Sequence, residues 1–450
     1  MFNRDIIDYL EKWKEKNSRK PLILRGARQV GKTFAVNIFA AKHFTDFIYI
    51  NLEKAEDYEL FKDIRSLSDF EKTADIVLGK KIIPGQTLVF IDEIQNTPNL
   101  IELLRFFYEE RPELHVIAAG SLLEVKIKKQ GLAMPVGRIE YAFVYPLTFF
   151  EFLEATGEKK ILEFLKKLKL AESIPAAVHE RALKLFNDYA LIGGMPEIVA
   201  SYGKKSSQQE LNSLYGSLLT AYAEDVYKYA SSADVKYIRH VLEQSPYFAG
   251  ERITYEKFGG SGYRSREMGE AFEVLEKTML LRQLPATKSR ELPLVGQKKR
   301  AKKLMYLDVG FVNFKNNIQS EYVGLKDLSG LYRGKIAEQV VGQNIIASAA
   351  HMEQPLFYWA KERLQGSAEV DFCLVHEGNI LGIEVKSGHS HKLKSLLSFG
   401  GSVENGKLIR VYGGPFKKEK IRSGGRESEL LSLPFYLINR LFDFAGKHKT

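Results

Sequence analysis

The amino-acid sequence predicts an α/β protein, and three observations point to this class. Short apolar segments alternate with longer, helix-like stretches through the first 150 residues. Leu-, Lys- and Glu-rich segments with a period near 3.6 follow, from Leu147 to about Ala230. Strand-like and helix-like segments alternate again after Leu331. At about 150 residues per domain, a chain of this length holds roughly three domains.

The first 150 residues contain five predicted strands. These are Pro21–Arg25, Phe47–Asn51, Leu88–Ile91, Leu114–Ala119 and Tyr141–Tyr145. The segments between them are long enough for helices, so we expect a mainly parallel sheet covered on both faces. We place this core in residues 1–152 and a helical region in residues 153–233, with a turn at Gly193–Pro196.

Residues 234–315 predict a small basic domain of helices and a hairpin. Its best amphipathic helix is Arg264–Met279, with Val274, Leu275, Thr278 and Met279 on the buried side. The strand-like segments Leu280–Pro285 and Lys303–Leu307 flank a tip that carries two basic clusters, Lys288–Arg290 and Lys298–Lys303.

Residues 325–445 predict a second α/β domain. Its expected helices are Gly334–Ala350, Leu393–Phe399 and Glu429–Leu441, and its expected strands are Phe357–Trp359, Ala368–Val375 and Asn379–Val385. No internal repeat or low-complexity segment interrupts the chain.

Composition excludes several classes of protein. Hydrophobic residues make up 45% of the chain, which excludes a wholly disordered polypeptide. The single cysteine, Cys373, excludes an internal disulfide framework and a Cys-rich zinc site. Met1–Lys20 has no apolar signal-peptide core, and no segment is apolar enough to cross a membrane. We therefore expect a cytoplasmic protein that does not enter a membrane. Its net charge of +10 mildly favours an acidic partner such as nucleic acid.

A phosphate-binding motif follows the first strand and opens a helix. The sequence Gly26-Ala27-Arg28-Gln29-Val30-Gly31-Lys32-Thr33 matches G-x-x-x-x-G-K-[ST] at every fixed position. Its glycines let backbone N–H groups curl around an anion, to which the helix N-terminus adds a positive dipole. We expect Lys32 to bridge the β- and γ-phosphates of ATP and Thr33 to ligate Mg²⁺.

An acidic pair ends the third strand. Asp92 is expected at the carboxyl edge of the sheet, near Mg²⁺, and Glu93 is the natural general base for the attacking water. Because the strand Phe47–Asn51 separates the two motifs in sequence, we expect the acidic strand not to neighbour the phosphate-loop strand.

Two further residues have two interpretations each. Ser121 follows the fourth strand, where its hydroxyl can sense the γ-phosphate or orient the water; it also begins the capping-box pattern Ser121-x-x-Glu124, and both roles are compatible. Arg138 either stabilises transition-state charge or forms a structural ion pair.

These motifs together resemble the prokaryotic AAA-type ATPases that carry a carboxyl-terminal domain called DUF4143. The matching segments are Gly26–Thr33, Leu88–Gln95, Ala119–Ser121, Gly137–Phe152, Leu191–Ile198, Gly334–Glu338, Ala368–Phe372 and Ile383–Ser387. The resemblance covers nearly the whole chain. It implies a P-loop AAA-type NTPase core with a helical appendage, a winged-helix-like domain over residues 234–315, and a restriction-endonuclease-like α/β domain at the end.

A winged helix suggests a nucleic-acid partner, DNA above all. A recognition helix within Arg264–Met279 and a basic wing suit a duplex groove and its phosphates. Alternatively, the helix and loop are solvated parts of a domain that packs against the ATPase, or they contact protein. The Gly259–Gly262 segment is too irregular to be a dinucleotide-binding fingerprint.

The last domain carries a charged constellation on a predicted hairpin. If Glu377-Gly378 is the turn, Asp371 lies opposite Glu384 and shares a face with Lys386. Val370, Phe372, Leu374, Ile383 and Val385 are then expected on the other face.

This is the pattern of PD-(D/E)xK nucleases, although Val370 stands where that signature has proline. Asp371 and Glu384 would hold Mg²⁺, Lys386 would position water, and Glu338 matches the acidic residue often found in the first helix. The alternative is an ion-paired cluster on a solvated sheet face. His389 and His391 follow, and no second carboxylate or cysteine nearby supports zinc.

The sequence thus predicts ATP binding and hydrolysis with Mg²⁺, driving a conformational change in a DNA-related module. The module is either an ATP-regulated nuclease, a non-cleaving switch that docks nucleic acid or protein, or a signalling scaffold. AAA-type ATPases often form rings in which a neighbour supplies an arginine, so a homo-oligomer is a further expectation.

Overall fold

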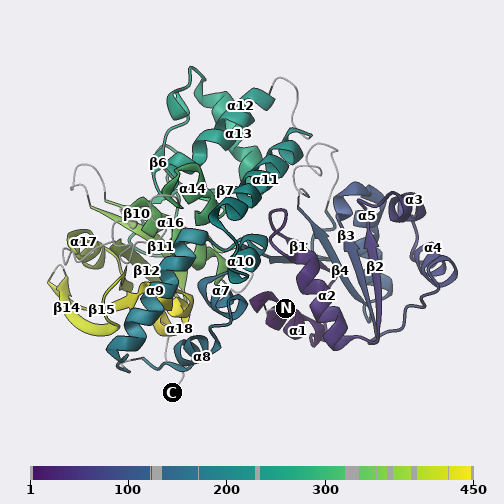
Figure 1. The fold of residues 1–450 in the computed structure, drawn as a ribbon, viewed down its shortest axis with the longest axis horizontal. Coiled ribbons are helices and arrows are strands. Elements are labelled where there is room, and N and C mark those ends of the chain that lie inside the picture. Colours follow the sequence, from purple (N-terminus) through teal and green to yellow (C-terminus); the bar gives the residue numbers. More distant parts are fainter. Residues whose placement is uncertain are drawn as a thin grey trace.

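Three sheets organise the computed structural model, which describes residues 4–121, 123, 134–170, 172–228, 234–319, 334–349, 352–361, 368–386, 393–423 and 425–446. In Figure 1 the five-stranded sheet lies on the right and the seven-stranded sheet on the left, with helices between them. Within the described ranges, every helix is too short or too polar to cross a bilayer.

The amino-terminal sheet is entirely parallel, with the order β2-β3-β4-β1-β5. Its strands are β1 (Leu22–Arg25), β2 (Asp46–Asn51), β3 (Thr87–Asp92), β4 (His115–Gly120) and β5 (Glu140–Phe143). All five agree with the predicted strands to within two residues. As predicted, β4 separates the acidic strand β3 from the phosphate-loop strand β1. The helices of this part are α1 (Asp5–Lys14), α2 (Lys32–His43), α3 (Ala55–Phe61), α4 (Leu67–Lys72) and α5 (Pro98–Glu110).

Alternating burial explains why these strands lie inside. Leu22 and Leu24 pack into the cluster that contains α1 and α2, and Ile23 packs into the cluster on the other face, with α4 and α5. An apolar strand that is buried on both faces is what a parallel sheet covered by helices requires.

The expected helical region is present and leads into the later sheets. It comprises α7 (Phe149–Ala155), α8 (Lys159–Lys167), α9 (Ala176–Ile192), α10 (Pro196–Gly203) and α11 (Gln208–Tyr227). Capping boxes begin two of them, Thr148 with Glu151 and Ser207 with Glu210. The predicted turn at Gly193 ends α9.

The next segment has the connectivity of a winged helix. It runs through α12 (Val235–Gln244), β6 (Arg252–Ile253), α13 (Ser265–Lys277), β7 (Leu281–Leu284) and β9 (Lys302–Tyr306), and the sheet order is β6-β9-β7. The buried side of α13 is formed by Met268, Ala271, Phe272 and Leu275, while Val274, predicted to be buried, is half-buried.

The wing between β7 and β9 does not project freely. Its short strand β8 (Ala286–Thr287) pairs in parallel with β10 (Phe357–Ala360) and so becomes the edge of the seven-stranded sheet. The helix α14 (Val309–Lys315) follows β9 and packs against α9 and α16 (Lys335–Ala347).

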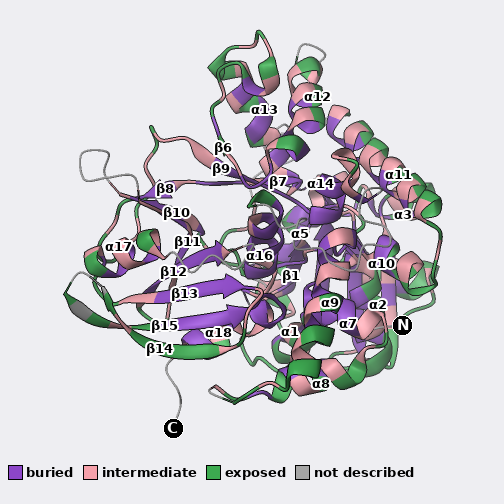
Figure 2. Cartoon of the chain, turned by 60° about the vertical axis from the view of Figure 1, so that its left-hand side comes forward, coloured by how far each residue is buried: buried purple, intermediate pink, exposed green. Residues whose placement is uncertain are grey.

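The seven-stranded sheet has the order β14-β15-β13-β12-β11-β10-β8. Its remaining elements are β11 (Glu369–His376), β12 (Asn379–Lys386), α17 (Lys394–Ser402), β13 (Gly406–Tyr412), β14 (Lys417–Ser423), β15 (Arg426–Pro434) and α18 (Leu441–Ala445). Figure 2 shows that the central strands are buried and that β14 is exposed. The predicted hairpin register is confirmed, since Phe372 pairs with Ile383 and His376 with Asn379.

Two expectations for this part are wrong. Glu429–Pro434 was expected to begin a helix but belongs to strand β15, because Leu430 packs on one face of the sheet while Leu431 and Leu433 pack on the other. Val370 was expected to share a face with Phe372. A register shift between β10 and β11 instead places Val370 with Cys373 in the cluster under α17.

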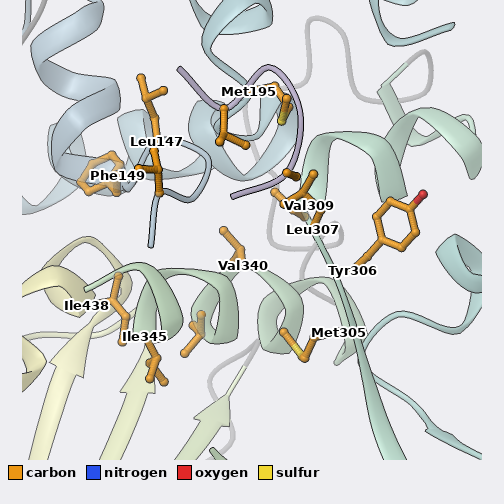
Figure 3. Close-up of a cluster of buried hydrophobic side chains, with 14 of the residues drawn as sticks. Leu147, Phe149, Met195, Met305, Tyr306, Leu307, Val309, Val340, Ile345 and Ile438 are labelled. Atoms are coloured by element: carbon orange, nitrogen blue, oxygen red, sulfur yellow. The ribbon is translucent and has the colours of Figure 1, made fainter. Parts of the chain in front are cut away.

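One hydrophobic cluster connects all of these parts, with members from Ile6 to Ala445. Figure 3 shows a part of it, where side chains from the loop before α7, from β9 and from α16 lie near one another. The labelled residues are Leu147, Phe149, Met195, Met305, Tyr306, Leu307, Val309, Val340, Ile345 and Ile438.

Candidate functional site

The phosphate loop, Gly26–Thr33, lies between β1 and α2, as the motif predicts. Gly31 has φ of +92°, a left-handed conformation that favours glycine, and a Cβ at Gly26 would overlap the carbonyl oxygen of Val144. The ammonium of Lys32 is buried inside the loop, where it donates to Gly26 O at 3.0 Å and Ala27 O at 2.9 Å. Burial lowers the pKa of Lys32.

The hydroxyl of Thr33 and the carboxylate of Asp92 meet at the end of the sheet. Thr33 Oγ1 donates to Asp92 Oδ2 at 2.6 Å, and the Tyr49 hydroxyl donates to the same oxygen at 3.3 Å. Burial raises the pKa of Asp92, an effect that the Thr33 hydrogen bond opposes. These two groups fit Mg²⁺, because a hydroxyl and a carboxylate oxygen are ligands that this cation accepts.

Glu93 stands beside this pair on a strained turn. It adopts φ of +53°, and its side chain accepts hydrogen bonds from Gln95 Nε2 and, at 3.3 Å, from Ser121 Oγ. Ser121 is therefore placed next to the expected general base, at the end of β4. Its expected capping partner Glu124 lies outside the described residues. Gln95 is a site residue that sequence reasoning missed, although it is the last residue of the Leu88–Gln95 segment.

Residues far apart in sequence hold the loop from outside. Arg4 is 4% exposed and donates to Val30 O and Tyr145 O, both at 2.8 Å. From α11, the Tyr222 hydroxyl donates to Arg28 O at 2.9 Å, and Asp225 accepts from Arg28 Nη1 at 2.5 Å. No local signal in the sequence pointed to these contacts.

Arg138 lies at the wrong edge of the sheet for the expected transition-state contact. It immediately precedes β5, whose first residue pairs beside Leu22 at the start of β1, whereas the phosphate loop follows the end of β1. Its Nε donates to Glu109 Oε1 at 2.9 Å. Of the two interpretations, the structure shows the ion pair, and Arg138 does not reach a γ-phosphate bound to its own chain.

A buried polar joint connects the ATPase sheet to the later sheets. Leu147 N donates to Gly194 O at 2.6 Å, and Gly194 N donates to Asp308 Oδ2 at 2.7 Å. Asp308 is fully buried and also accepts from Gly310 N at 2.9 Å and from Gln343 Nε2 at 3.2 Å. Burial raises the pKa of Asp308 to about 6.

Helix α16 extends this joint by hydrogen bonds to strand β9 and to the start of α7. Gln339 exchanges two hydrogen bonds with the backbone of Tyr306 in β9, at 3.0 and 2.8 Å. Asn344 Oδ1 accepts from Phe149 N at 3.0 Å. A single helix thus contacts the ATPase part through Asn344 and strand β9 through Gln339.

The structure brings the predicted carboxyl-terminal residues together, with one addition. Lys386 Nζ lies 2.5 Å from Glu384 Oε1, and Asp371 Oδ2 accepts from Val385 N at 2.8 Å. Glu338 reaches the cluster from α16, where its Oε2 lies 2.7 Å from the ammonium of Lys303. Lys303 comes from the basic segment expected at the wing tip, and sequence reasoning gave it no role here.

Lys303 and burial together set the charges of this cluster. The Lys303 ammonium is also 3.5 Å from Asp371 Oδ1. Burial, followed by the nearby Asp371, raises the pKa values of Glu338 and Glu384 to about 7. Burial alone lowers the pKa of Lys303, but Glu338 and Asp371 outweigh it and the pKa is raised, so the side chain stays charged.

The expected Mg²⁺ site at Glu338, Asp371 and Glu384 does not fit this arrangement. Among the described residues, no group of three or more His, Cys, Asp or Glu side chains is placed to hold a metal ion. The physical reason is that the Lys303 ammonium lies between Glu338 and Asp371, while Glu384 is paired with Lys386. His389 and His391 lie outside the described residues.

A cationic cleft lies where the wing meets the seven-stranded sheet. It encloses about 650 Å³, and among the residues that the structure describes no carboxylate lines it. Its charged lining residues are Lys288, Arg290, Lys298, Lys299, Arg300 and Lys361. Arg300 is fixed by Ala360 O and Lys361 O, at 3.2 and 3.1 Å, so the cleft spans the wing and β10.

The predicted recognition helix is not basic. Helix α13 carries four glutamates against one arginine and one lysine. Both cations form ion pairs within the helix, Arg266 with Glu270 and Lys277 with Glu273. The positive charge of this domain is therefore concentrated at the wing and not on α13.

Comparisons with known proteins match three segments of the chain. Residues 18–153 match an AAA domain, residues 183–322 match a domain of unknown function, DUF8612, and residues 333–433 match the domain of unknown function DUF4143. None of the curated proteins matches the sequence.

Several solved structures are similar at low identity. The Walker-type ATPase PABY2304 of Pyrococcus abyssi is 16% identical over 70% of this chain and 96% of that one, with a TM-score of 0.45. The RuvB Holliday junction branch migration motor of Thermotoga maritima is 16% identical over 66% and 93%, with a TM-score of 0.29. PCH-2 of C. elegans is 9% identical over 44% and 59%, with a TM-score of 0.26.

The family matches agree with the geometry of the site. The AAA match contains the phosphate loop, the acidic pair and Ser121, and the DUF4143 match contains Glu338, Asp371, Glu384 and Lys386. The chain thus contains an AAA-type ATPase domain at residues 18–153 and a DUF4143 domain at residues 333–433, as its motifs predict.

Proposed function

We propose that Gly26–Thr33 binds ATP and that Glu93 activates the water that attacks the γ-phosphate. The observation that carries this proposal is the hydrogen bond between Thr33 and Asp92, with Glu93 adjacent to it. Thr33 and Asp92 would hold Mg²⁺, which supplies charge neutralisation at the phosphates when bound. Lys32 contributes a buried positive charge, and Ser121 and Gln95 orient the Glu93 carboxylate.

The Glu93→Gln variant tests this assignment. A general base contributes about 100-fold or more to the rate, so kcat for ATP hydrolysis is expected to fall at least that far. Binding of a fluorescent ATP analogue is expected to persist, because the phosphate loop is unchanged. Glu102→Gln, on the exposed face of α5, is the matched control. Unchanged kcat in Glu93→Gln would exclude Glu93 as the base.

We further propose that the ATPase works on a nucleic acid whose phosphates bind in the cationic cleft. Within the described part of the chain, six cations line this cleft and no carboxylate does, which suits a polyanion. The negative charge of α13 makes the cleft a better candidate than the predicted recognition helix. The polar joint at Asp308 supplies a route by which nucleotide-dependent movement reaches this part.

Salt dependence tests the cleft. The Lys298→Ala/Lys299→Ala variant is expected to bind a labelled DNA duplex more weakly and to reduce the slope of log K against log salt by roughly 2. The matched control is Lys159→Ala/Lys160→Ala, two exposed lysines at the start of α8. An equal slope in both variants would refute this surface, and binding without any salt dependence would refute a nucleic-acid partner.

Within this proposal, the DUF4143 domain docks nucleic acid and does not cut it while Lys303 lies between Glu338 and Asp371. A nuclease is the second candidate, and two observations favour it. The elements follow one another along the chain in the order α16-β10-β11-β12-α17-β13, and the residues of the nuclease pattern, Asp371, Glu384 and Lys386, are neighbours. Cleavage assays with Mg²⁺ or Mn²⁺, with and without ATP, separate the two. Cutting that is lost in both Asp371→Ala and Lys386→Ala, while ATP turnover survives, would establish the nuclease.

A further inference from the structure

Strand β9 carries a lysine into the centre of the acidic cluster. The Lys303 side chain is 3% exposed, and its ammonium lies 2.7 Å from Glu338 Oε2, 3.5 Å from Asp371 Oδ1 and 3.9 Å from Glu369 Oε1. It also approaches the backbone oxygen of Asp371 at 3.4 Å. One cation thus faces carboxylates from α16 and β11 together with a carbonyl oxygen.

This set of oxygens is of the kind that a divalent cation takes in proteins. On the neighbouring strand β12, the Oε2 of Glu384 is buried and has no hydrogen-bond partner among the described residues. Carboxylates this close repel one another when ionised, so a buried cation between them stabilises their charged forms. Lys303 supplies such a cation from within the chain.

We infer that Lys303 is an internal counter-ion that takes the cation position of this cluster, so that a divalent metal binds there only when Lys303 is absent or withdrawn. An ammonium and a metal ion cannot share the same oxygens at these distances. The inference explains why the side chains expected to bind metal are gathered in one place yet do not form a metal site.

The position of Lys303 in the chain suggests how it is withdrawn. It lies in the same strand as Tyr306, which Gln339 holds, and five residues before Asp308, which contacts Gly194 at the joint with the ATPase. A shift of this strand moves Lys303 away from Glu338. This route rests on the proposed coupling function, whereas the exclusion of metal by Lys303 does not.

Metal counting on the nucleotide-free, full-length protein tests the exclusion. Electron paramagnetic resonance of free Mn²⁺ gives the number of ions bound per chain. Lys303→Met is expected to bind one Mn²⁺ more than wild type, and Lys303→Met/Asp371→Asn is expected to lose it. Lys302→Met, the neighbouring lysine that contacts the Tyr255 hydroxyl, is the matched control and is expected to match wild type.

Two results would overturn the inference. One is a folded Lys303→Met variant that binds no additional Mn²⁺; the other is wild-type protein that already binds Mn²⁺ in a manner abolished by Asp371→Asn. Neither result depends on ATP turnover or on DNA binding, so a failure here is distinct from a failure of the proposed function.

A second variant covers the case in which Lys303→Met does not fold. Removing one partner from a buried ion pair is strongly destabilising, because it leaves carboxylates without compensation. The Lys303→Met/Glu338→Gln variant removes one negative charge with the positive one and leaves Asp371 and Glu384. It is expected to fold and to bind the additional Mn²⁺, and its failure to bind while folded counts equally against the inference.

Discussion

Replacing Asp308 with alanine is predicted to uncouple the ATPase sheet from the rest of the molecule. The carboxylate accepts three buried hydrogen bonds, from Gly194 N, Gly310 N and Gln343 Nε2. A buried donor without an acceptor costs about 1–2 kcal/mol or more, so three of them are expected to lower the free energy of unfolding by roughly 3–6 kcal/mol. Asp443→Ala, at an exposed ion pair on α18, is the control and is expected to cost less than about 1 kcal/mol.

The two tryptophans allow this loss to be located. Trp13 lies in α1 of the ATPase part and Trp359 lies in β10 of the seven-stranded sheet, and both are buried. Urea unfolding followed in single-tryptophan variants is expected to show coincident transitions with Asp308 present and separated transitions in Asp308→Ala. A midpoint equal to that of Asp443→Ala, at both probes, would refute the reasoning.

The ionisation of Asp308 adds a dependence on pH. Burial raises its pKa from the ordinary 3.8 to about 6 in the folded protein, so the folded state binds the proton more tightly. The contribution of this group therefore makes the protein more stable as pH falls from about 6 to about 4, by roughly 3 kcal/mol in full. Asp308→Asn is expected to remove this contribution, and an unchanged pH profile of unfolding would contradict it.

Three further predictions concern the phosphate loop and the core. Arg4→Ala is expected to weaken binding of a fluorescent ATP analogue about tenfold, because the hydrogen bonds that tie Val30 of the loop to Tyr145 through Arg4 are lost, whereas Lys14→Ala is not. Gly194→Ala is expected to abolish the joint, because a Cβ would overlap a backbone oxygen; limited proteolysis should then cut the chain faster than in Gly203→Ala, where there is space. Burial lowers the pKa of His115 to about 4. The unfolded chain therefore binds the proton more tightly, and the folded protein loses stability as pH falls from about 6.5 toward 4. His115→Phe should flatten that part of the pH profile of unfolding.

Local patterns in the sequence predicted the elements whose residues are close together in the chain. The phosphate loop, the acidic end of β3 and the separation of β3 from β1 follow from motif spacing. The register that pairs Phe372 with Ile383 follows from a two-residue turn, and Glu377 and Gly378 indeed both have positive φ.

Long-range packing decided the rest. Lys303 stands in a basic segment that is typical of a solvated loop, yet it is buried, with its ammonium against Glu338 of α16 and Asp371 of β11. Leu430–Leu433 suits a helix or a strand, and the neighbours β13 and β14 selected the strand. The four domain ranges, the homo-oligomer and the cytoplasmic location stay predictions.

The pairing of β8 with β10 has a consequence for how the chain can be divided. The segments matched as DUF8612 and DUF4143 meet between residues 322 and 333, yet β8 of the first supplies an edge strand to the sheet of the second. A fragment that starts at residue 333 would expose the backbone of β10, and an open strand edge invites aggregation. Recombination or truncation at that point therefore separates two parts of one sheet, and fragments that contain β10 are expected to aggregate less when they also keep β8.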